Sequence, residues 1–194
     1  MCAGSKDREM DTIERLLINV YPDCIASIVS DTWNLWDVLC DPRLRQICDN
    51  RSGKFVGRPD SGDPVKIVIG DPAHHDERAR RGAIQCLADT LGSFERPGKL
   101  RLIGRPHPVF LNTGGLIYGD GINEDRGDRM LTGIRNRGFS PYNQVFGNGS
   151  YTYQFTTRDD YGHAMKATAQ KQNGIIVPMF KDPYTDDGGK RSAY

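Results

Sequence analysis

Four short segments of this 194-residue chain combine carboxylates, arginines and glycines, the groups that bind sugar phosphates. Asp31 lies in the first, at residues 27–33, and Arg58 and Asp60 lie in the second, Arg-Pro-Asp-Ser-Gly-Asp-Pro at residues 58–64. Carboxylates accept hydrogen bonds from sugar hydroxyls, and a guanidinium group binds phosphate oxygens in a bidentate manner. Each segment taken alone also has a structural explanation. Asp31 can cap the next helix, and Pro-Asp-Ser-Gly is a common turn.

The other two segments are rich in glycine. Gly119 and Gly121 flank Asp120 after an apolar run, and glycines let the backbone approach a ligand closely. Residues 146–150 read Phe-Gly-Asn-Gly-Ser, and Arg158 follows. A glycine loop after a strand exposes N–H groups to a phosphate, although each segment alone is equally compatible with a tight turn. Together, the four segments predict a sugar-phosphate site with carboxylates for ribose and glycines and arginines for phosphate.

An alternation of short apolar runs with helical patterns must position these segments. Runs rich in Ile, Val, Leu and Phe predict strands, and apolar residues spaced three and four apart predict helices. Strands that alternate with helices indicate a parallel sheet, in which the site lies at the carboxyl ends of the strands. The strands are expected at 25–30, 54–57, 116–118 and 145–146, and the helices at 5–20, 33–47 with a break at Pro42, 78–91, 123–136 and 156–161.

The predicted fold class is α/β, with about four or five strand–helix units. A closed eight-stranded β/α barrel needs about 250 residues, so the chain corresponds to a partial barrel. We expect residues 1–181 to form this domain and residues 182–194 to form a loop-like tail. Residues 98–112 are expected to be a surface excursion, and 164–169 and 175–180 to be extended. The charged side chains at 78, 80, 81 and 89 are expected to form a solvated helix face.

Composition excludes several classes of function. The formal net charge of +1 gives no basic excess for nucleic acid, and no apolar run approaches the ~20 residues that cross a bilayer. The five cysteines include no CxxC pair, and no export signal is evident, which favours a reduced cytoplasmic setting with structural thiols. His74 and His75 have no third ligand at metal-binding spacing, so no protein metal site is expected.

At these four segments, the sequence resembles the nicotinamide phosphoribosyltransferase family. The resemblance extends through Thr157-Arg158-Asp159, residues 180–183 and residues 190–192, so it covers most of the chain. It implies a type II phosphoribosyltransferase fold, which is a β/α barrel with an added β-rich domain, and a homodimer with interfacial active sites. It also implies pentosyl transfer from phosphoribosyl pyrophosphate to nicotinamide, which serves NAD biosynthesis.

The resemblance also implies roles for individual residues. Asp31 corresponds to the carboxylate that orients a catalytic histidine, and Asp60 corresponds to a second catalytic carboxylate. Mg²⁺ is expected to bind to pyrophosphate rather than to protein ligands. The implied ribose contacts are Arg58, Asp60, Gly119 and Asp120. The implied contacts of the 5′-phosphate are Gly149, Ser150 and Arg158. Basic residues near the pyrophosphate or nucleotide end correspond to Lys166, Lys181 and Lys190.

The chain also departs from the family. Position 150 is Ser where the family commonly has Gly. The family's phosphorylatable histidine and its nicotinamide pocket are expected before Met1, and the family continues past Tyr194, so we interpret the chain as a fragment that an N-terminal half would complete. Three alternatives stay open: a nicotinate phosphoribosyltransferase, a non-catalytic phosphate-binding subunit of a split enzyme, and an unrelated sugar-phosphate barrel enzyme.

Overall fold

A four-stranded parallel sheet forms the centre of the protein. The computed structural model describes residues 6–96, 108–149, 154, 156, 158–163, 167–178 and 184. The strand order is β1-β2-β5-β6, and each neighbouring pair is parallel, as the alternating pattern predicts. The strands are β1 (Ala26–Val29), β2 (Phe55–Arg58), β5 (Gly114–Tyr118) and β6 (Gln144–Phe146).

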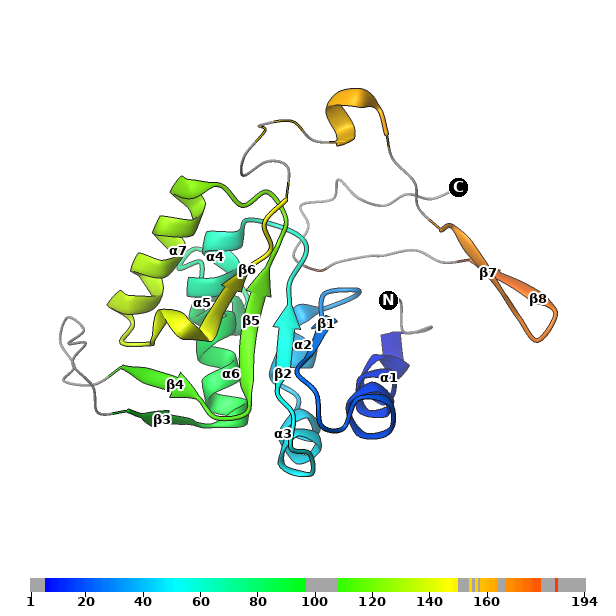
Figure 1. The fold of residues 1–194 in the computed structure, drawn as a ribbon, viewed down its shortest axis with the longest axis horizontal. Helices are drawn as coiled ribbons and strands as arrows, with labels where there is room; N and C mark the ends of the chain where they lie inside the picture. Colours follow the sequence, from blue (N-terminus) through cyan, green and yellow to red (C-terminus); the bar gives the residue numbers. More distant parts are fainter. Residues whose placement is uncertain are drawn as a thin grey trace.

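The register brings the carboxyl ends of the strands to one edge. Val29 pairs with Arg58 at the ends of β1 and β2, and Tyr118 pairs with Phe146 at the ends of β5 and β6. The arrowheads of β2 and β5 point to this same edge (Figure 1). The four segments singled out in the sequence therefore leave the sheet on the same side.

Helices surround the sheet, with α1 beyond β1 and α7 beyond β6 (Figure 1). Several begin at a side-chain cap: Asn34 caps α2, Asp41 caps α3, Asp63 caps α4 and Asn123 caps α7. Helix α6 packs against β5, and α4 packs against α7. The helices are α1 (Glu9–Glu14), α2 (Leu35–Leu39), α3 (Pro42–Asp49), α4 (Pro64–Ile69), α5 (Glu77–Arg81), α6 (Ala83–Leu91) and α7 (Glu124–Asn136).

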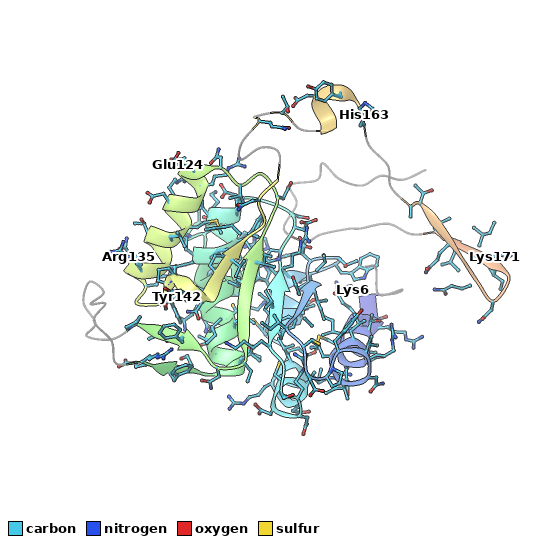
Figure 2. All side chains as sticks on the ribbon, in the orientation of Figure 1. Lys6, Glu124, Arg135, Tyr142, His163 and Lys171 are labelled. Atoms are coloured by element: carbon cyan, nitrogen blue, oxygen red, sulfur yellow. The ribbon has the colours of Figure 1, made fainter. Side chains whose placement is uncertain are left out.

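The apolar helix faces form one core with the sheet. Glu124 and Arg135 lie on the outer side of α7, and both are exposed (Figure 2). Helix α1 is preceded by a 3-10 turn, η1 (Lys6–Arg8), and continues as a π-helical turn, η2 (Arg15–Val20). The largest fully buried side chains are Trp36, Tyr118, Phe55, Ile13, Leu17, Leu35, Leu39, Leu44, Ile84, Leu87, Leu91 and Leu116.

The expected helix at 78–91 is divided in two at Gly82. This glycine has a φ of 80°, and a Cβ there would lie 2.4 Å from the Gly70 nitrogen, so both the conformation and the contact require glycine. The prediction of a solvated charged face is wrong at Arg78, which is half-buried. Its guanidinium pairs with Asp37 of α2 at 2.8 Å and with Asp76, the N-cap residue of α5, at 2.9 Å.

Two elements were not expected from the sequence. Helix α4 has only six residues, too few to show a helical period, and begins where Asp63 caps a turn that starts with Pro64. Strands β3 (Ser93–Glu95) and β4 (Val109–Leu111) form an antiparallel pair on either side of residues 97–107. Strand β4 occupies the end of the segment that we expected to be a surface excursion.

The C-terminal part contains short elements. A 3-10 turn, η3 (Pro141–Asn143), leads into β6, and another, η4 (Arg158–Tyr161), lies within the helix expected at 156–161. Strands β7 (Ala169–Gln172) and β8 (Ile175–Pro178) form an antiparallel hairpin, so the first extended run begins later than expected. None of the helices in the described ranges is long and apolar enough to cross a membrane.

Candidate functional site

The ends of β1 and β2 are joined by Asp31. Its side chain is fully buried, and its Oδ2 accepts a hydrogen bond from the backbone N–H of Asp60 over 2.8 Å. One residue earlier, the Ser30 N–H donates to the Arg58 carbonyl over 3.1 Å. Asp31 does not cap the following helix, because Asn34 does so through the N–H of Trp36. The structural alternative for Asp31 is therefore wrong.

Arg58 and Asp60 form an ion pair at the carboxyl edge. Arg58 Nη2 lies 3.1 Å from Asp60 Oδ1, and both side chains are partly open to solvent. A Cβ on Gly119 would lie 3.8 Å from Arg58 Nη2, so the guanidinium extends from β2 to the end of β5. Within the described part of the chain, the buried Arg58 Nε has no hydrogen-bond acceptor. This donor is the kind of group that a bound anion satisfies.

The rest of the Pro-Asp-Ser-Gly segment is fixed by Tyr118. The Tyr118 hydroxyl donates to the Ser61 carbonyl at 2.7 Å and lies 3.2 Å from the Gly62 carbonyl oxygen. Asp63 then accepts from the N–H groups of Val65 and Lys66 and starts α4. The segment is thus a turn, as its composition indicates, and it also presents Arg58 and Asp60 at the sheet edge.

Tyr118 also shows that the carboxylates converge. Burial raises the pKa of its hydroxyl well above the ordinary value, and the negative charges of Asp31, Asp120 and Asp60 raise it further. All three carboxylates are therefore close enough to act on one hydroxyl at the end of β5. A concentration of negative charge of this kind suits a ligand that carries several hydroxyl donors.

Glycines make close packing possible at the ends of β5 and β6. The Gly147 N–H donates to the Tyr118 carbonyl over 2.9 Å, and a Cβ on Gly147 would lie 3.0 Å from the Gly119 Cα. Gly121 has a φ of 60°, and its carbonyl accepts from the Arg126 side chain. A Cβ on Gly149 would meet no atom of the described residues within 4 Å. The backbone after β6 is therefore open to a ligand at Gly149.

The structure brings six predicted site residues to the carboxyl edge. Asp31, Arg58 and Asp60 come from β1 and β2, and the others follow β5 and β6. The backbone of Arg158 lies in η4, and its side chain is outside the described part. Ser150, Lys166, Lys181 and Lys190 also fall outside the described residues. The predicted residues at the edge are Asp31, Arg58, Asp60, Gly119, Asp120 and Gly149.

Sequence reasoning missed Glu9, which lies near Asp31. Its side chain on α1 is only 6% exposed and hydrogen-bonds with Thr32. Burial is the main cause that raises the pKa of Glu9 to about 7, and the charges of Asp31 and Asp37 act in the same direction. One pattern could have revealed it. Glu9 lies four residues before Ile13 and therefore falls on the apolar face of the helix.

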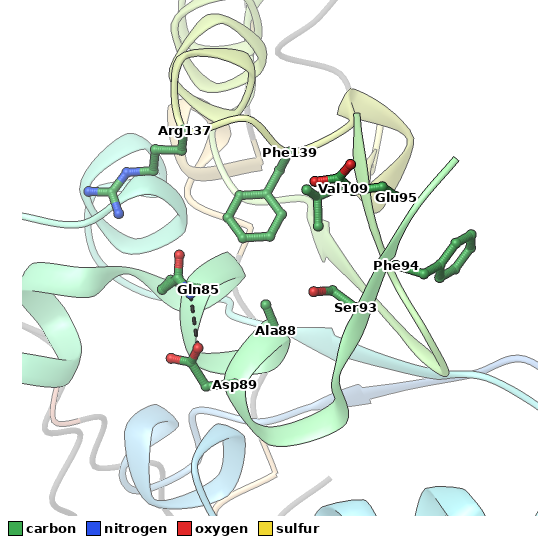
Figure 3. Close-up of a pocket in the computed structure, with 9 residues that line it drawn as sticks. All are labelled: Gln85, Ala88, Asp89, Ser93, Phe94, Glu95, Val109, Arg137 and Phe139. Atoms are coloured by element: carbon green, nitrogen blue, oxygen red, sulfur yellow. Dashed lines mark hydrogen bonds between the residues drawn. The ribbon is translucent and has the colours of Figure 1, made fainter. Parts of the chain in front are cut away.

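A separate cavity of about 320 Å³ lies near the β3–β4 pair (Figure 3). Phe139 faces it after α7, Ala88 lines it from α6, and Ser93 lines it from β3. Gln85 donates a hydrogen bond to Asp89 beside it. Its lining includes none of the six predicted site residues that lie at the carboxyl edge.

Metal-ligating side chains do not cluster in the described ranges. No group of three or more His, Cys, Asp or Glu side chains there is arranged to hold a metal ion. His74 and His75 stack on one another with ring centroids 4.4 Å apart, and His75 Nε2 lies 2.6 Å from the Tyr184 hydroxyl. This contact joins residues 109 positions apart in the sequence.

The fold and the edge define an α/β protein with a carboxylate-rich and glycine-rich site at the carboxyl ends of a parallel sheet. Comparison with known proteins gives the family: residues 25–193 match the nicotinate phosphoribosyltransferase (NAPRTase) family, and the chain belongs to it. The chain is 45% identical over 202 residues to the nicotinamide phosphoribosyltransferase of Acinetobacter baylyi, with all of the chain and 39% of that relative covered.

Two further relatives carry the same name. The Mycoplasma pneumoniae nicotinamide phosphoribosyltransferase is 32% identical over 189 residues, which cover 96% of the chain and 40% of the relative. The Xanthomonas campestris nicotinamide phosphoribosyltransferase is 29% identical over 187 residues, which cover 94% and 36%, respectively. The chain therefore spans about two fifths of the length of the curated relatives that it matches.

Proposed function

We propose that this chain is part of a nicotinamide phosphoribosyltransferase and supplies the ribose-phosphate side of its active site. The reaction transfers the phosphoribosyl group of phosphoribosyl pyrophosphate to nicotinamide, and it releases nicotinamide mononucleotide and pyrophosphate for NAD biosynthesis. The observation that carries the proposal is the meeting of Asp31, Asp60 and Arg58 at one sheet edge, in a chain 45% identical to a nicotinamide phosphoribosyltransferase.

In this proposal, the carboxylates act on the ribose. The bond between ribose C1 and the pyrophosphate oxygen breaks, and a bond from C1 to the pyridine nitrogen forms. Asp60 and Asp120 accept hydrogen bonds from the ribose hydroxyls and stabilise the positive charge that develops at C1. Asp31 fixes the backbone of Asp60 and, as the resemblance implies, orients a catalytic histidine supplied by the rest of the enzyme.

Phosphate binding is assigned to the glycine loop after β6. Gly149, Ser150 and Arg158 hold the 5′-phosphate, and the absence of crowding around Gly149 supports a close approach by the ligand. Lys166, Lys181 and Lys190 are assigned to the pyrophosphate or nucleotide end. Arg58, which extends toward Gly119, adds a fixed positive charge beside the ribose.

Mg²⁺ enters this scheme as part of the substrate. Mg²⁺ commonly keeps several waters and binds through substrate phosphates, so pyrophosphate would carry it into the site. We therefore assign Mg²⁺ no protein ligand. The side chains of this chain hold the ribose, while the ion neutralises charge on the departing pyrophosphate.

The architecture of the whole enzyme is also a proposal. We infer a partial β/α barrel of the type II phosphoribosyltransferase kind, which an N-terminal half completes, in a cytoplasmic homodimer. The open parallel sheet of four strands supports the barrel, because such a sheet forms about half of an eight-stranded one.

Nicotinate phosphoribosyltransferase is the second candidate, because the family that the chain matches bears that name. Both enzymes share the ribose-phosphate chemistry and differ in the base, whose pocket we expect outside this chain. A non-catalytic phosphate-binding subunit of a split enzyme would use the same edge without turnover.

The test is product formation from phosphoribosyl pyrophosphate and Mg²⁺, with nicotinamide and nicotinate assayed side by side. The chain would be assayed alone and together with its upstream half. We expect turnover of nicotinamide only in the combined preparation. Turnover of nicotinate alone would select the second candidate, and a combined preparation that is folded but inactive with both bases would select the non-catalytic subunit.

A further inference from the structure

Two cysteines from the packed helices α2 and α6 lie close together. Cys40 ends α2, and Cys86 lies in α6, which packs against α2. Their side chains hydrogen-bond to each other, although 46 positions separate them in the sequence. Cys86 is buried, and Cys40 is partly exposed. One thiol is therefore accessible to solvent, and its partner is held directly behind it.

The two thiols have opposite electrostatic environments. The hydrogen bond with Cys86 is the main cause that lowers the pKa of Cys40, and the nearby positive charges of Arg78 and Arg81 lower it further against burial and Asp76. For Cys86, the hydrogen bond with Cys40 and burial raise the pKa. The two shifts favour a thiolate at Cys40 over one at Cys86, whose Sγ also donates to the Arg78 carbonyl over 3.5 Å. A reactive cysteine and a resolving cysteine need this asymmetry.

A cavity gives small molecules access to the pair. It has a volume of about 380 Å³, and both Cys40 and Cys86 line it. Arg45, Arg81 and Asp89 also line it, and Arg81 forms an ion pair with Asp89 there. The volume far exceeds that needed for a water-sized molecule such as a peroxide.

The other described cysteines lack this arrangement. Cys24 is exposed. Cys48 is buried, and burial raises its pKa to about 11, so its thiol stays protonated at neutral pH. These two residues differ from the pair in exposure and environment, and they serve as internal controls.

We propose that Cys40 and Cys86 form a peroxide-responsive thiol pair that closes into an intramolecular disulfide. The Cys40 thiolate attacks one oxygen of hydrogen peroxide, the O–O bond breaks, and the released hydroxide takes up a proton to form water. Cys40 becomes a sulfenic acid. The Cys86 thiol then attacks the Cys40 sulfur, the S–O bond breaks, and a second water leaves. Two thiols are oxidised, and one peroxide is reduced to two waters.

The disulfide would join α2 to α6. Helix α2 begins four residues after Asp31, and its Asp37 pairs with Arg78 of α5. The cross-link would therefore restrain the helix that follows β1. A disulfide between Cys40 and Cys86 would also close a loop in the unfolded chain and restrict its conformations. Oxidation is therefore expected to raise the midpoint of thermal unfolding.

The test uses the whole chain, reduced and then exposed to dilute hydrogen peroxide. Free thiols are blocked before digestion, and the peptides are analysed by mass spectrometry without reduction. The expected result is a pair of peptides joined by a disulfide between Cys40 and Cys86. Its mass is the sum of the two peptide masses less two hydrogens, and the linked species disappears after reduction. A linked peptide that joins either residue to another cysteine, or oxidation with no linked peptide, would overturn the proposal.

Single serine variants separate the two roles. In Cys86→Ser, a sulfenic acid at Cys40 should persist and react with dimedone, and in Cys40→Ser, Cys86 should stay reduced. Cys24→Ser and Cys48→Ser should form the same linked peptide as the unsubstituted chain. Thermal unfolding of each reduced variant checks the fold first. Dimedone labelling of Cys86 in Cys40→Ser would show that Cys86 is reactive on its own and would contradict the proposal.

Discussion

The backbone N–H of Asp60 donates a partly buried hydrogen bond of 2.8 Å to the carboxylate of Asp31. Asp31 follows β1 and Asp60 follows β2, so one side chain sets the distance between two loops of the carboxyl edge. The bond therefore restrains the backbone that carries the Asp60 carboxylate.

Asp31→Ala is expected to lower the free energy of unfolding by about 1.5–3 kcal/mol, the range for a hydrogen bond to a charged group. The N–H of Asp60, which is partly buried, would lose its acceptor. Urea denaturation measures the change. Asp37→Ala is the control, because Asp37 is an exposed member of an ion pair with Arg78, and such pairs contribute about 0–1 kcal/mol. Equal losses in the two variants would contradict the role given to Asp31.

Asp60→Asn is expected to depress turnover more than phosphate binding in the assembled enzyme. The substitution keeps the shape of the side chain and its backbone hydrogen bond, but it removes the charge that faces Arg58 and the developing charge on ribose. Turnover and the affinity for phosphoribosyl pyrophosphate are measured on the same preparation. If both fall by the same factor, the effect is one on folding, and Asp60 has no special part in the reaction.

Gly147→Ala is expected to destabilise the chain by about 1–3 kcal/mol, because overpacking has costs of that order. The added Cβ would lie 3.0 Å from the Gly119 Cα and would push the ends of β5 and β6 apart. Gly149→Ala is the matched control, since a Cβ at residue 149 meets no atom of the described residues within 4 Å. Thermal unfolding of both variants decides the matter, and a larger loss for residue 149 would contradict the packing described.

Glu9 makes stability depend on pH. Its pKa in the folded state, about 7, lies above the ordinary value of 4.5, so the folded chain binds the proton more tightly than the unfolded chain. The contribution of Glu9 to the free energy of unfolding is therefore greatest below pH 4.5, and it declines as the pH rises toward 7. The decline is roughly 3 kcal/mol, because one pKa unit corresponds to about 1.4 kcal/mol.

Glu9→Gln should remove this dependence. The neutral amide has no charge to bury, so the variant should be more stable than the parent chain at pH 8 and similar to it near pH 4. Urea denaturation at both pH values measures the difference. Glu14→Gln, an exposed position of the same helix, should leave the pH profile unchanged. A parent chain that becomes no less stable between these pH values would refute the role of Glu9.

Much of the sheet edge could be predicted from the sequence. Runs such as residues 25–30 and 116–118 combine apolar side chains with an abrupt change to Asp or Gly, and this local pattern marks both the strand and the place where it ends. The parallel order follows from the alternation of strands and helices. Asp31, Asp60 and Asp120 could therefore be assigned to one edge before the structure was known.

Contacts between distant segments could not be predicted. The approach of Arg58 to Gly119 and the meeting of Cys40 with Cys86 depend on how β2 lies beside β5 and how α2 packs on α6. Neither contact produces a periodic pattern of residues in the sequence. Helix α4 was missed for a different reason, since six residues are too few to establish a helical period.

The central claim is that the carboxyl edge of the sheet binds the ribose and 5′-phosphate of nicotinamide mononucleotide. Titration of the isotope-labelled chain with this nucleotide, followed by the NMR signals of its backbone amides, tests the claim most directly. We predict saturable shifts at Asp60, Asp120 and Gly147, with smaller shifts or none around the cavity near β3. Saturable shifts confined to other parts of the chain, or no response at the three residues at any concentration tested, would contradict it.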